Sequence, residues 1–267
     1  MQTNNSSKRT KPIPRDSVND ILTIPRPIVG MAREIPSGYV IERHQHIRSQ
    51  LLYASSGVMT VETGIGVWIV PPLRAVWIPA YTYHQILASG HVAMRTLYIQ
   101  QGVYNGLPEG CCVVSVTPLL RELILHAVAM PLLYQLNGPE ERLMNVIPDQ
   151  IQAMNIAPLE LPIPKDARLK KIYKHLAGRP EDNRTLEDWG KRVGATGRTL
   201  ARRFRLETGM TFGQWRQQIR ILEALRRLGM DEPVTTVAIA LGYDSPSAFI
   251  SMFKKTLGKT PGQYFAK

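Results

Sequence analysis

Residues 185–204 read Thr185-Leu-Glu-Asp-Trp-Gly-Lys-Arg-Val-Gly-Ala-Thr-Gly-Arg-Thr-Leu-Ala-Arg-Arg-Phe204, and this stretch decides the fold of the C-terminal part of the chain. Thr185 and Thr196 are residues that cap helix N-termini, and Gly194 is of the type that ends a helix. The stretch therefore predicts two short helices joined by a tight turn, which is a helix-turn-helix unit over about residues 185–206.

The side chains of this unit divide into an apolar side and a basic side. Leu186, Trp189 and Val193 share one face of the first helix, and Leu200 and Phe204 share one face of the second, so the pair can enclose a small core. The side left outside carries Arg198, Ala201, Arg202 and Arg205. Guanidinium groups at such spacings can bind guanine edges or phosphates, and the alternative is a solvated basic face.

The same pattern recurs near the C-terminus, over about residues 234–257. Ser245 is a helix cap, and Pro246 occupies the first helical position, where a missing N–H has no cost. Between the units, residues 212–228 contain no helix breaker and predict a helix of roughly 25 Å. With the width of the units added, this approaches the ~34 Å between successive major-groove faces, so one chain could occupy two grooves.

The positive charge is concentrated in the same region. The net charge of the chain is +12, and from Lys165 onward 21 Lys and Arg stand against 10 Asp and Glu, which leaves the preceding part nearly neutral. This asymmetry indicates a C-terminal domain for a polyanion and an N-terminal domain with another task.

The N-terminal part predicts an antiparallel β structure followed by helices. Short β-branched or aromatic segments, interrupted by Gly and Pro, run to about residue 100 and are typical of a sandwich or barrel. Two helices are expected next, from residue 118 and near residues 140–153, and they could either pack on the barrel or pair two subunits.

Three further features set boundaries. Residues 1–24 are polar and predict a disordered tail, and residues 158–167 are rich in Pro and predict an extended linker. No apolar run reaches 18 residues, which excludes a membrane-spanning helix. Cys111 and Cys112 are adjacent and favour a reduced, cytoplasmic protein, with both thiols acting as small buried hydrophobes.

Residues 168–267 resemble the DNA-binding domain of the AraC/XylS family of bacterial transcription regulators. The shared motifs, in the order of the family, are Arg198-Thr-Leu-Ala-Arg-Arg-Phe204, Glu207-Thr-Gly-Met210, Ala238-x-x-Leu-Gly-Tyr-x-Ser-x-Ser-x-Phe249, Phe253-Lys-Lys255 and Gly258-x-Thr-Pro-x-x-Tyr264. We expect DNA contacts from these positions and their neighbours: Arg198, Thr199, Ala201, Arg202 and Arg205 in the first unit, and Ser247, Ile250, Ser251 and Lys254 in the second.

Two positions depart from this family. Ser251 stands where many members have Arg, so the resemblance implies less base reading and more backbone contact from the second unit. Gly190 stands where Ala is common; Gly inside a helix costs roughly 0.5–1 kcal/mol, and we interpret it as allowing a close crossing beside Trp189.

A histidine pattern in the N-terminal part resembles a cupin. It runs Gly38-x5-His44-x-His46-x3-Gln50-x6-Gly57 and continues with Trp77-Ile-Pro-Ala-Tyr-Thr-Tyr-His84. The resemblance implies that His44, His46, Gln50 and His84 converge in a small β-barrel, as in the sensor half of many AraC-type regulators. Three alternatives remain open, namely a divalent transition metal, a polar effector pocket without metal, and histidines that are simply satisfied in the core. Gln50 in place of the usual Glu and Tyr81 in place of a turn Gly weaken the metal alternative.

Aromatic residues extend the candidate effector site. Trp77 and Tyr83 are expected to bind an effector together with the histidines and Gln50, and Trp68 could also line an apolar pocket, although aromatic residues of this kind more often belong to the core.

The overall prediction is an α+β chain of two domains. A cupin-like antiparallel β-barrel with following helices spans residues 25–157, and an all-α domain of two helix-turn-helix units and a linker helix spans residues 168–267. We expect a regulator rather than an enzyme, one that requires no cofactor, binds operator DNA and a small effector, is a homodimer, could contact RNA polymerase, and controls nearby genes for transport or detoxification. The competing readings are a metal cupin enzyme and a nonspecific nucleoid protein.

Overall fold

A computed structural model describes residues 21–152, 156–157 and 159–265. The tail expected over residues 1–24 lies outside the described residues as far as residue 20. Residues 21–24 do not continue such a tail, because the buried Arg48 holds them. Its Nε donates to the Leu22 carbonyl at 3.0 Å and its Nη2 donates to the Ile24 carbonyl at 2.6 Å.

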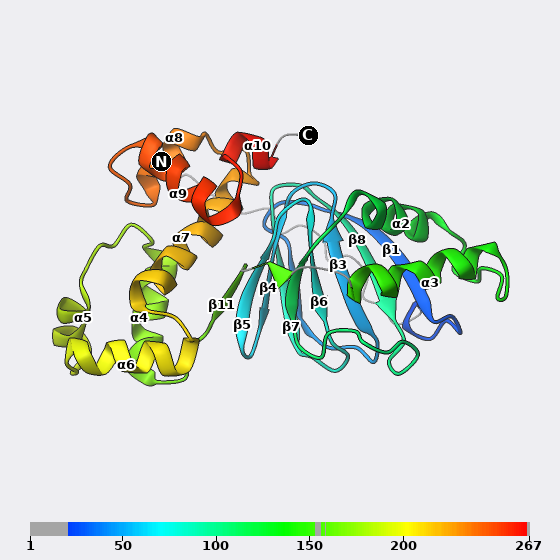
Figure 1. Cartoon of the computed structure of the whole chain (residues 1–267), viewed down its shortest axis with the longest axis horizontal. Coiled ribbons are helices and arrows are strands. Elements are labelled where there is room, and N and C mark those ends of the chain that lie inside the picture. The colour runs from blue at the N-terminus through cyan, green and yellow to red at the C-terminus, as the bar shows by residue number, and fades with distance from the viewer. Residues whose placement is uncertain (1–20, 153–155, 158, 266–267) are drawn as a thin grey trace, which may run out of the picture.

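Two antiparallel sheets form the N-terminal domain (Figure 1). Within the described residues, one sheet has six strands in the order β1-β8-β3-β6-β9-β10, and the other has five in the order β11-β5-β4-β7-β2. The strands are β1 (Ile28–Ile35), β2 (Val40–His44), β3 (Ser49–Ala54), β4 (Val58–Thr63), β5 (Gly66–Val70), β6 (Arg74–Ile78), β7 (His84–Ser89), β8 (Val92–Ile99), β9 (Cys112–Ser115), β10 (Ile156–Ala157) and β11 (Glu160–Pro162).

The six-stranded sheet is covered on both faces, as the central strand β3 illustrates. All residues of β3 are buried, although its side chains alternate between the two faces of the sheet. Leu52 belongs to the core between the sheets, whereas Leu51 and Tyr53 belong to a second core on the outer face. Because both faces are covered, this strand reads as a continuous apolar run in the sequence.

Helices α2 (Pro118–Ala129) and α3 (Pro139–Gln152) form that second core. Helix α2 packs on β1 and β8, and a Cβ on Gly30 would lie only 2.7 Å from the Ala127 carbonyl oxygen, so the strand and the helix touch through their backbones. Of the two arrangements that the sequence leaves open, packing of these helices on the barrel is observed.

The C-terminal domain is all-α, so the predicted fold class is confirmed. Its helices are α4 (Ala167–Gly178), α5 (Leu186–Val193), α6 (Gly197–Thr208), α7 (Phe212–Leu228), α8 (Val234–Ala240), α9 (Pro246–Leu257) and α10 (Pro261–Phe265). Helix α7 runs between the two small units (Figure 1), and the aromatic rings of Phe204 and Trp215 pack at 5.1 Å in its first half.

The segment predicted to be a free linker is partly a strand. Leu161 of β11 pairs with Val67 of β5, which adds β11 to the edge of the five-stranded sheet. The outer edge of β11 is closed by α7: Trp215 Nε1 donates to the Pro162 carbonyl at 3.2 Å, and Gln218 Nε2 donates to the Glu160 carbonyl at 3.2 Å. The carbonyl groups along an exposed strand edge need hydrogen-bond donors, and here α7 supplies them. The linker is therefore extended, and its strand is held against α7.

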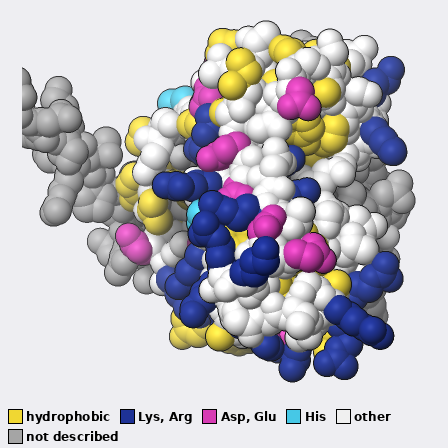
Figure 2. Space-filling view, turned by 90° about the vertical axis from the view of Figure 1, so that its left-hand side faces the viewer, with side chains coloured by type: hydrophobic (Ala, Val, Ile, Leu, Met, Phe, Trp, Pro, Cys, Tyr) yellow, Lys and Arg dark blue, Asp and Glu magenta, His cyan; other side chains and the backbone are white. Residues whose placement is uncertain are grey.

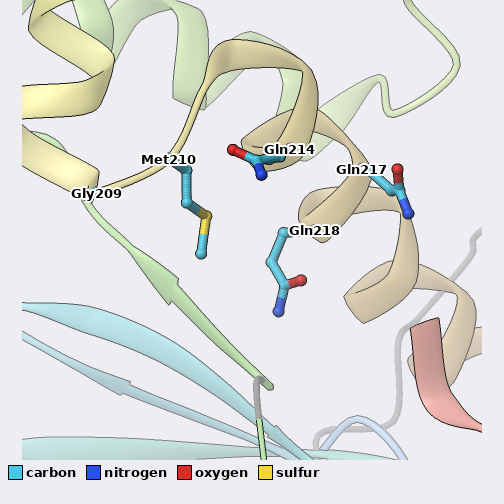
Figure 3. A pocket seen from close by; sticks show the side chains of 5 residues that line it. All are labelled: Gly209, Met210, Gln214, Gln217 and Gln218. Carbon is cyan, nitrogen blue, oxygen red and sulfur yellow. The ribbon is translucent and has the colours of Figure 1, made fainter.

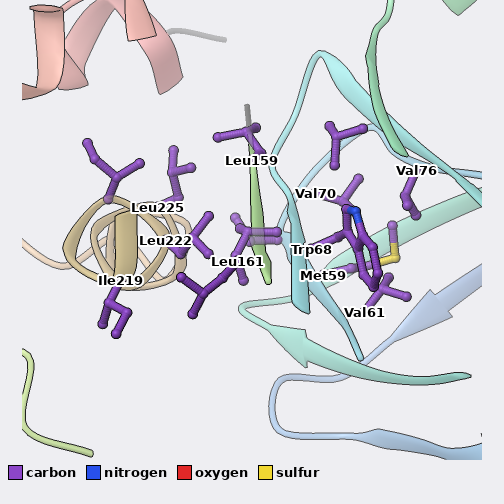
Figure 4. Close-up of a cluster of buried hydrophobic side chains, with 14 of the residues drawn as sticks. Met59, Val61, Trp68, Val70, Val76, Leu159, Leu161, Ile219, Leu222 and Leu225 are labelled. Carbon is purple, nitrogen blue, oxygen red and sulfur yellow. The ribbon is translucent and has the colours of Figure 1, made fainter. Parts of the chain in front are cut away.

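Helix α7 consequently belongs to two cores. Figure 4 shows Leu222 and Leu225 of α7 facing Leu159 and Leu161, with Trp68 on the barrel side of the strands. All five side chains are at most 5% exposed. The buried apolar cluster thus continues from the barrel interior into the helical domain.

The end of α7 also touches the barrel closely. A Cβ on Gly229, which directly follows the helix, would lie 2.1 Å from Val58 Cγ2, and a Cβ on Gly90 would lie 2.6 Å from the Gly229 carbonyl oxygen. Only residues without a side chain allow this approach.

Candidate nucleic-acid interface and histidine site

The first helix-turn-helix unit is built from local capping interactions. Thr185 and Asp188 form a reciprocal capping box at the start of α5, and Gly194 ends that helix at φ +71°. Thr196 Oγ1 then accepts from Thr199 N at 3.2 Å to start α6. Gly190 is required where α5 meets this turn, because a Cβ there would lie 2.3 Å from the Ala195 carbonyl oxygen. The close neighbour of Gly190 is therefore the turn rather than a crossing helix.

Helix α6 presents the predicted basic face to solvent. Leu200 and Phe204 are buried on its inner side, while Arg198, Arg202 and Arg205 are exposed. Ala201 is also exposed, and Thr199 is half-buried with its hydroxyl 3.0 Å from Thr196 Oγ1.

None of these three guanidinium groups forms an ion pair with a carboxylate of the described chain, whereas Arg203 lies 3.8 Å from Asp166 and 3.9 Å from Glu207. The three arginines are thus available to an external anion.

The second unit has the same construction and a different outer face. Ser245 caps α9 through Ala248 N at 3.2 Å, Pro246 stands in its first turn, and Gly258 ends the helix at φ +81°. Among the predicted contacts, Ser247, Ser251 and Lys254 are exposed and Ile250 is half-buried. Lys255, which the sequence did not single out, is exposed beside Lys254. This helix offers two hydroxyl groups and lysines where α6 offers arginines.

The basic side chains gather on one face of the molecule. Figure 2 shows the side on which the helical domain lies, with clusters of Lys and Arg at the centre and along the lower edge of the view. An electropositive surface of this kind binds polyanions through counterion release.

The histidine pattern converges inside the barrel. His44, His46 and His84 place one ring nitrogen each within 4.8 Å of one another, and the ring centroids of His44 and His84 are 4.3 Å apart. His46 Nε2 lies 3.1 Å from Gln50 Oε1, and Gln50 Nε2 donates to Thr96 Oγ1 at 2.9 Å. The four predicted residues therefore form one cluster.

Backbone carbonyl groups fix the tautomers of these rings. The Nδ1 atoms of His44, His46 and His84 lie 2.8, 2.5 and 2.8 Å from the carbonyl oxygens of Glu42, Arg48 and Thr82. A carbonyl oxygen only accepts, so Nδ1 of His44 and of His84 carries the proton, and each of these rings, when neutral, keeps its lone pair on Nε2. His46 faces an acceptor oxygen at both nitrogens, the Arg48 carbonyl at Nδ1 and Gln50 Oε1 at Nε2. This second set of bonds is the arrangement that orients metal-binding histidines.

Burial disfavours the charged forms of His46 and His84. Desolvation, together with smaller contributions from the charges of His44 and His46, lowers the pKa of His84 to about 3. Desolvation also lowers the pKa of His46. Among the described side chains, His84 Nε2 is buried without a hydrogen-bond partner, which is an observation that a bound metal or effector would explain.

The aromatic residues expected in this site lie elsewhere. Trp77 belongs to the core under α2 and α3, and its Nε1 donates to the Pro108 carbonyl at 2.7 Å. It points away from the histidines because Ile78 and His84, not Trp77, face the space between the sheets. Tyr83 is 51% exposed and stacks on Arg43, whose Cζ is 5.3 Å from the ring centroid. Trp68 does face the barrel interior.

Sequence reasoning missed Tyr98 in this cluster. Its ring lies 5.2 Å from that of His46, edge to face, and its hydroxyl is 3.5 Å from Gln50 Nε2. Its position two residues after Thr96 in an alternating strand was the available signal, because both side chains must share a face.

A cavity of about 260 Å³ lies beside α7, lined by Gly209, Met210, Gln214, Gln217 and Gln218 (Figure 3). Gln217 Nε2 already donates to Thr256 Oγ1 at 3.1 Å and so joins α7 to α9, whereas Gln218 Nε2 donates to the Glu160 carbonyl and joins α7 to β11. In the described part of the chain, no helix is long and apolar enough to cross a membrane.

Comparison with known proteins identifies a family model and several relatives that resemble this chain. Residues 189–267 match the family model described as a helix-turn-helix domain. The chain is 35% identical over 224 residues to the HTH-type transcriptional regulator NimR of Escherichia coli (strain K12), covering 84% of this chain and 82% of that protein.

Two more distant likenesses were found. The HTH-type transcriptional regulator RipA of Corynebacterium glutamicum is 29% identical over 103 residues, which is 39% of this chain and 31% of that protein. The crystal structure of ToxT from Vibrio cholerae O395 covers 89% of this chain and 96% of its own, with a TM-score of 0.38 and 12% identity.

Proposed function

Because the chain belongs to the AraC/XylS family of helix-turn-helix transcription regulators, we propose that it controls genes near its operator by inserting α6 and α9 into successive major grooves. The observation that supports this most is the exposed face of α6, where three guanidinium groups stand without carboxylate partners opposite a buried apolar face. Helix α7, at 17 residues, has the length that the two-groove arrangement needs.

The two units divide the work in this proposal. Arg198, Arg202 and Arg205 read bases and grip phosphates, with Thr199 and Ala201 filling the groove between them. Ser247, Ile250, Ser251 and Lys254 on α9 chiefly contact the backbone, because hydroxyl groups and a lysine position a protein on DNA without reading much sequence.

Binding of the full chain to fragments of its own genome, read by sequencing, tests this function. We expect a small number of sites with a shared bipartite motif. Affinities within about threefold of each other for all fragments at fixed salt would instead indicate a nonspecific nucleoid protein, since a regulator needs a specificity ratio of roughly 10³ or more.

The barrel is proposed to sense a small molecule at the histidine cluster. The support is a cluster of polar side chains in which His46, Gln50 and His84 are buried, His44 is half-buried and Nε2 of His84 lacks a hydrogen-bond partner. An effector changes DNA occupancy only if it binds the DNA-competent and incompetent states with different affinity. Trp77 and Tyr83 are not part of this proposal, because the structure places them outside the cluster.

A divalent transition metal is compatible with the same residues. If bound, it would be held by the Nε2 atoms of the three histidines, with Gln50 supplying a neutral oxygen. It would act as a Lewis acid toward an effector. The donor set contains no carboxylate, so we do not propose a hydrolytic or oxygen-activating enzyme, and no cofactor is required for DNA binding.

Titration with Zn²⁺ and Ni²⁺ followed by metal analysis tests this assignment. Wild-type protein is expected to retain about one ion per chain, and His44→Ala to retain none. Equal retention by both would place the metal elsewhere, and retention by neither would leave the cluster as an effector pocket without metal.

The remaining partners are proposals from family membership. We propose a homodimer that acts on DNA in the bacterial cytoplasm, with RNA polymerase as a possible contact and with transport or detoxification genes as targets. Three exposed leucines within the α2–α3 connection offer a surface for the second subunit: Leu132, Leu133 and Leu136.

A further inference from the structure

The two helix-turn-helix units meet at a buried arginine in the middle of α7. Arg220 is 9% exposed, and its donors are directed at the loop that precedes the first unit. Its Nε donates to the Pro180 carbonyl at 2.8 Å, and its Nη2 donates to Asn183 Oδ1 at 2.8 Å and to the Glu181 carbonyl at 3.4 Å. A buried cation must be hydrogen-bonded in a defined geometry to be tolerated.

The same guanidinium contacts the second unit. Its Cζ lies 5.6 Å from the ring centroid of Tyr243, the residue in the turn between α8 and α9, so the cation rests against this aromatic ring. Arg220 therefore touches both units from the helix that separates them.

The two units also touch directly beside Arg220. Gly242, at φ +75°, lies so close to the loop that a Cβ there would be 2.7 Å from the Glu181 carbonyl oxygen. The turn of the second unit thus rests on the loop that enters the first, with no space for adjustment.

That loop is itself fixed to α5. Asp182 Oδ2 accepts from His175 Nε2 at 2.8 Å and from Arg184 Nη1 at 2.5 Å. Arg184 lies over the ring of Trp189 in α5, with its Cζ 5.4 Å from the centroid. A displacement of the loop would therefore be transmitted to the first unit.

We propose that Arg220 is a positioning residue that fixes the spacing and angle between the two recognition helices, so that α6 and α9 engage DNA as one rigid pair. This inference rests on the proposed two-groove binding. A linked pair of weak contacts gains affinity only when the link holds both in register, and the gain falls as the link loosens.

Loss of the Arg220 contacts should weaken only the simultaneous binding of both units to DNA. Without the Arg220 contacts each unit keeps its own caps and its own core, because Leu200 and Phe204 in the first unit and Phe249 and Phe253 in the second are buried independently of the guanidinium. Each unit should still bind its half-site, and only the advantage of simultaneous binding should decrease.

The test uses the full chain and a duplex that the wild-type chain selects from a randomised library. Two further duplexes keep one half-site and scramble the other, and a fourth carries two extra base pairs between the half-sites. Arg220→Lys retains the charge but loses the planar fork of donors, and Asn183→Ala removes one acceptor on an exposed side chain. Arg226→Met is the matched control, because the hydrogen-bond partners of Arg226, Glu223 and Met230, lie on α7 or just after its end.

Wild type is expected to bind the complete duplex about tenfold or more tightly than either half-site, and to lose that advantage when two base pairs are inserted. Arg220→Lys and Asn183→Ala should weaken binding to the complete duplex about fivefold, leave the half-sites within about twofold, and tolerate the insertion better than wild type. Arg226→Met should preserve the wild-type preference.

Two results would overturn the inference. A loss in Arg220→Lys and Asn183→Ala that is equal on all four duplexes, with unchanged circular dichroism, would show that Arg220 supports folding or charge rather than register. Equal wild-type affinity for complete and half-site duplexes would instead refute two-groove binding itself. If Arg220→Lys does not fold, Asn183→Ala and Tyr243→Leu, which removes the ring beside the guanidinium, allow the same comparison.

Discussion

Trp215 of the helical domain donates its indole N–H to the carbonyl of Pro162, a residue of the strand that closes the edge of the barrel, at 3.2 Å. Together with the bond from Gln218 to Glu160, it attaches the helix between the two helix-turn-helix units to the wall of the N-terminal barrel. The same wall carries Trp68 on its inner side. A change inside the barrel therefore has a short, packed route to the DNA-binding domain, which is a prerequisite for differential affinity between two states.

Arg202→Ala should reduce affinity for the cognate operator by roughly 1–3 kcal/mol and relax the preference for one base pair, because it removes a guanidinium from the centre of the α6 face. Competition binding against a set of single-base variants measures both effects. Ser251→Ala serves as the comparison, and an effect as large as that of Arg202→Ala would show that α9 is the principal reader.

Lys254→Ala should weaken binding to all duplexes to a similar degree, because the proposed contact of this exposed lysine on α9 is with the phosphate backbone. The slope of log K against log salt concentration should become shallower by about 1. Filter binding at several salt concentrations checks this. A change in sequence preference with an unchanged slope would assign a base contact to Lys254.

Gly229→Ala should destabilise the protein by roughly 1–3 kcal/mol, because the new Cβ would lie 2.1 Å from Val58 Cγ2 in a packed interface. Chemical denaturation measures the free energy of unfolding. Gly213→Ala is the matched control, since it adds a Cβ in α7 where nothing lies within 4 Å. That change should be neutral or stabilise by up to about 1 kcal/mol. Equal stability of the two variants would mean that α7 does not dock on β4 as described.

Metal-free protein should lose stability as the pH falls from about 6.5 toward 3. His84 has a pKa lowered to about 3 by burial, against 6.5 for the exposed side chain, so the unfolded chain binds a proton that the folded chain excludes over this interval. Its contribution to the free energy of unfolding is complete above pH 6.5 and decreases by at most about 1.4 kcal/mol per pH unit below it. Denaturation of wild type and His84→Gln at several pH values checks this, and parallel pH profiles would contradict the assignment.

Local signals made the helical domain predictable. The Thr185 and Thr196 caps, Gly194 and Pro246 each have a conformational preference that acts within one or two turns, and the bounds of α7 coincide with the predicted residues 212–228. Helix periodicity alone likewise predicts that Arg202 and Phe204 lie on opposite faces of α6.

Contacts distant in sequence explain what prediction missed. Trp77 was assigned to the effector site because it lies near His84 in the chain, but strand alternation places it on the face covered by α2 and α3. Nothing in the sequence singles out Arg220, since only the folded chain brings Pro180 and Tyr243 to it. Residues 160–162 of the predicted linker form a strand because Leu161 pairs with Val67, 94 positions earlier.

The shared position of α7 limits how this protein can be recombined. Leu222 and Leu225 complete the surface of a barrel to which they do not belong in sequence. An exchange of sensor domains between related regulators would leave these leucines against a foreign wall unless β11 and the matching side of α7 moved with the barrel. A working chimera should therefore exchange the barrel together with the face of α7 that covers it, rather than only the residues before the linker at 158–167.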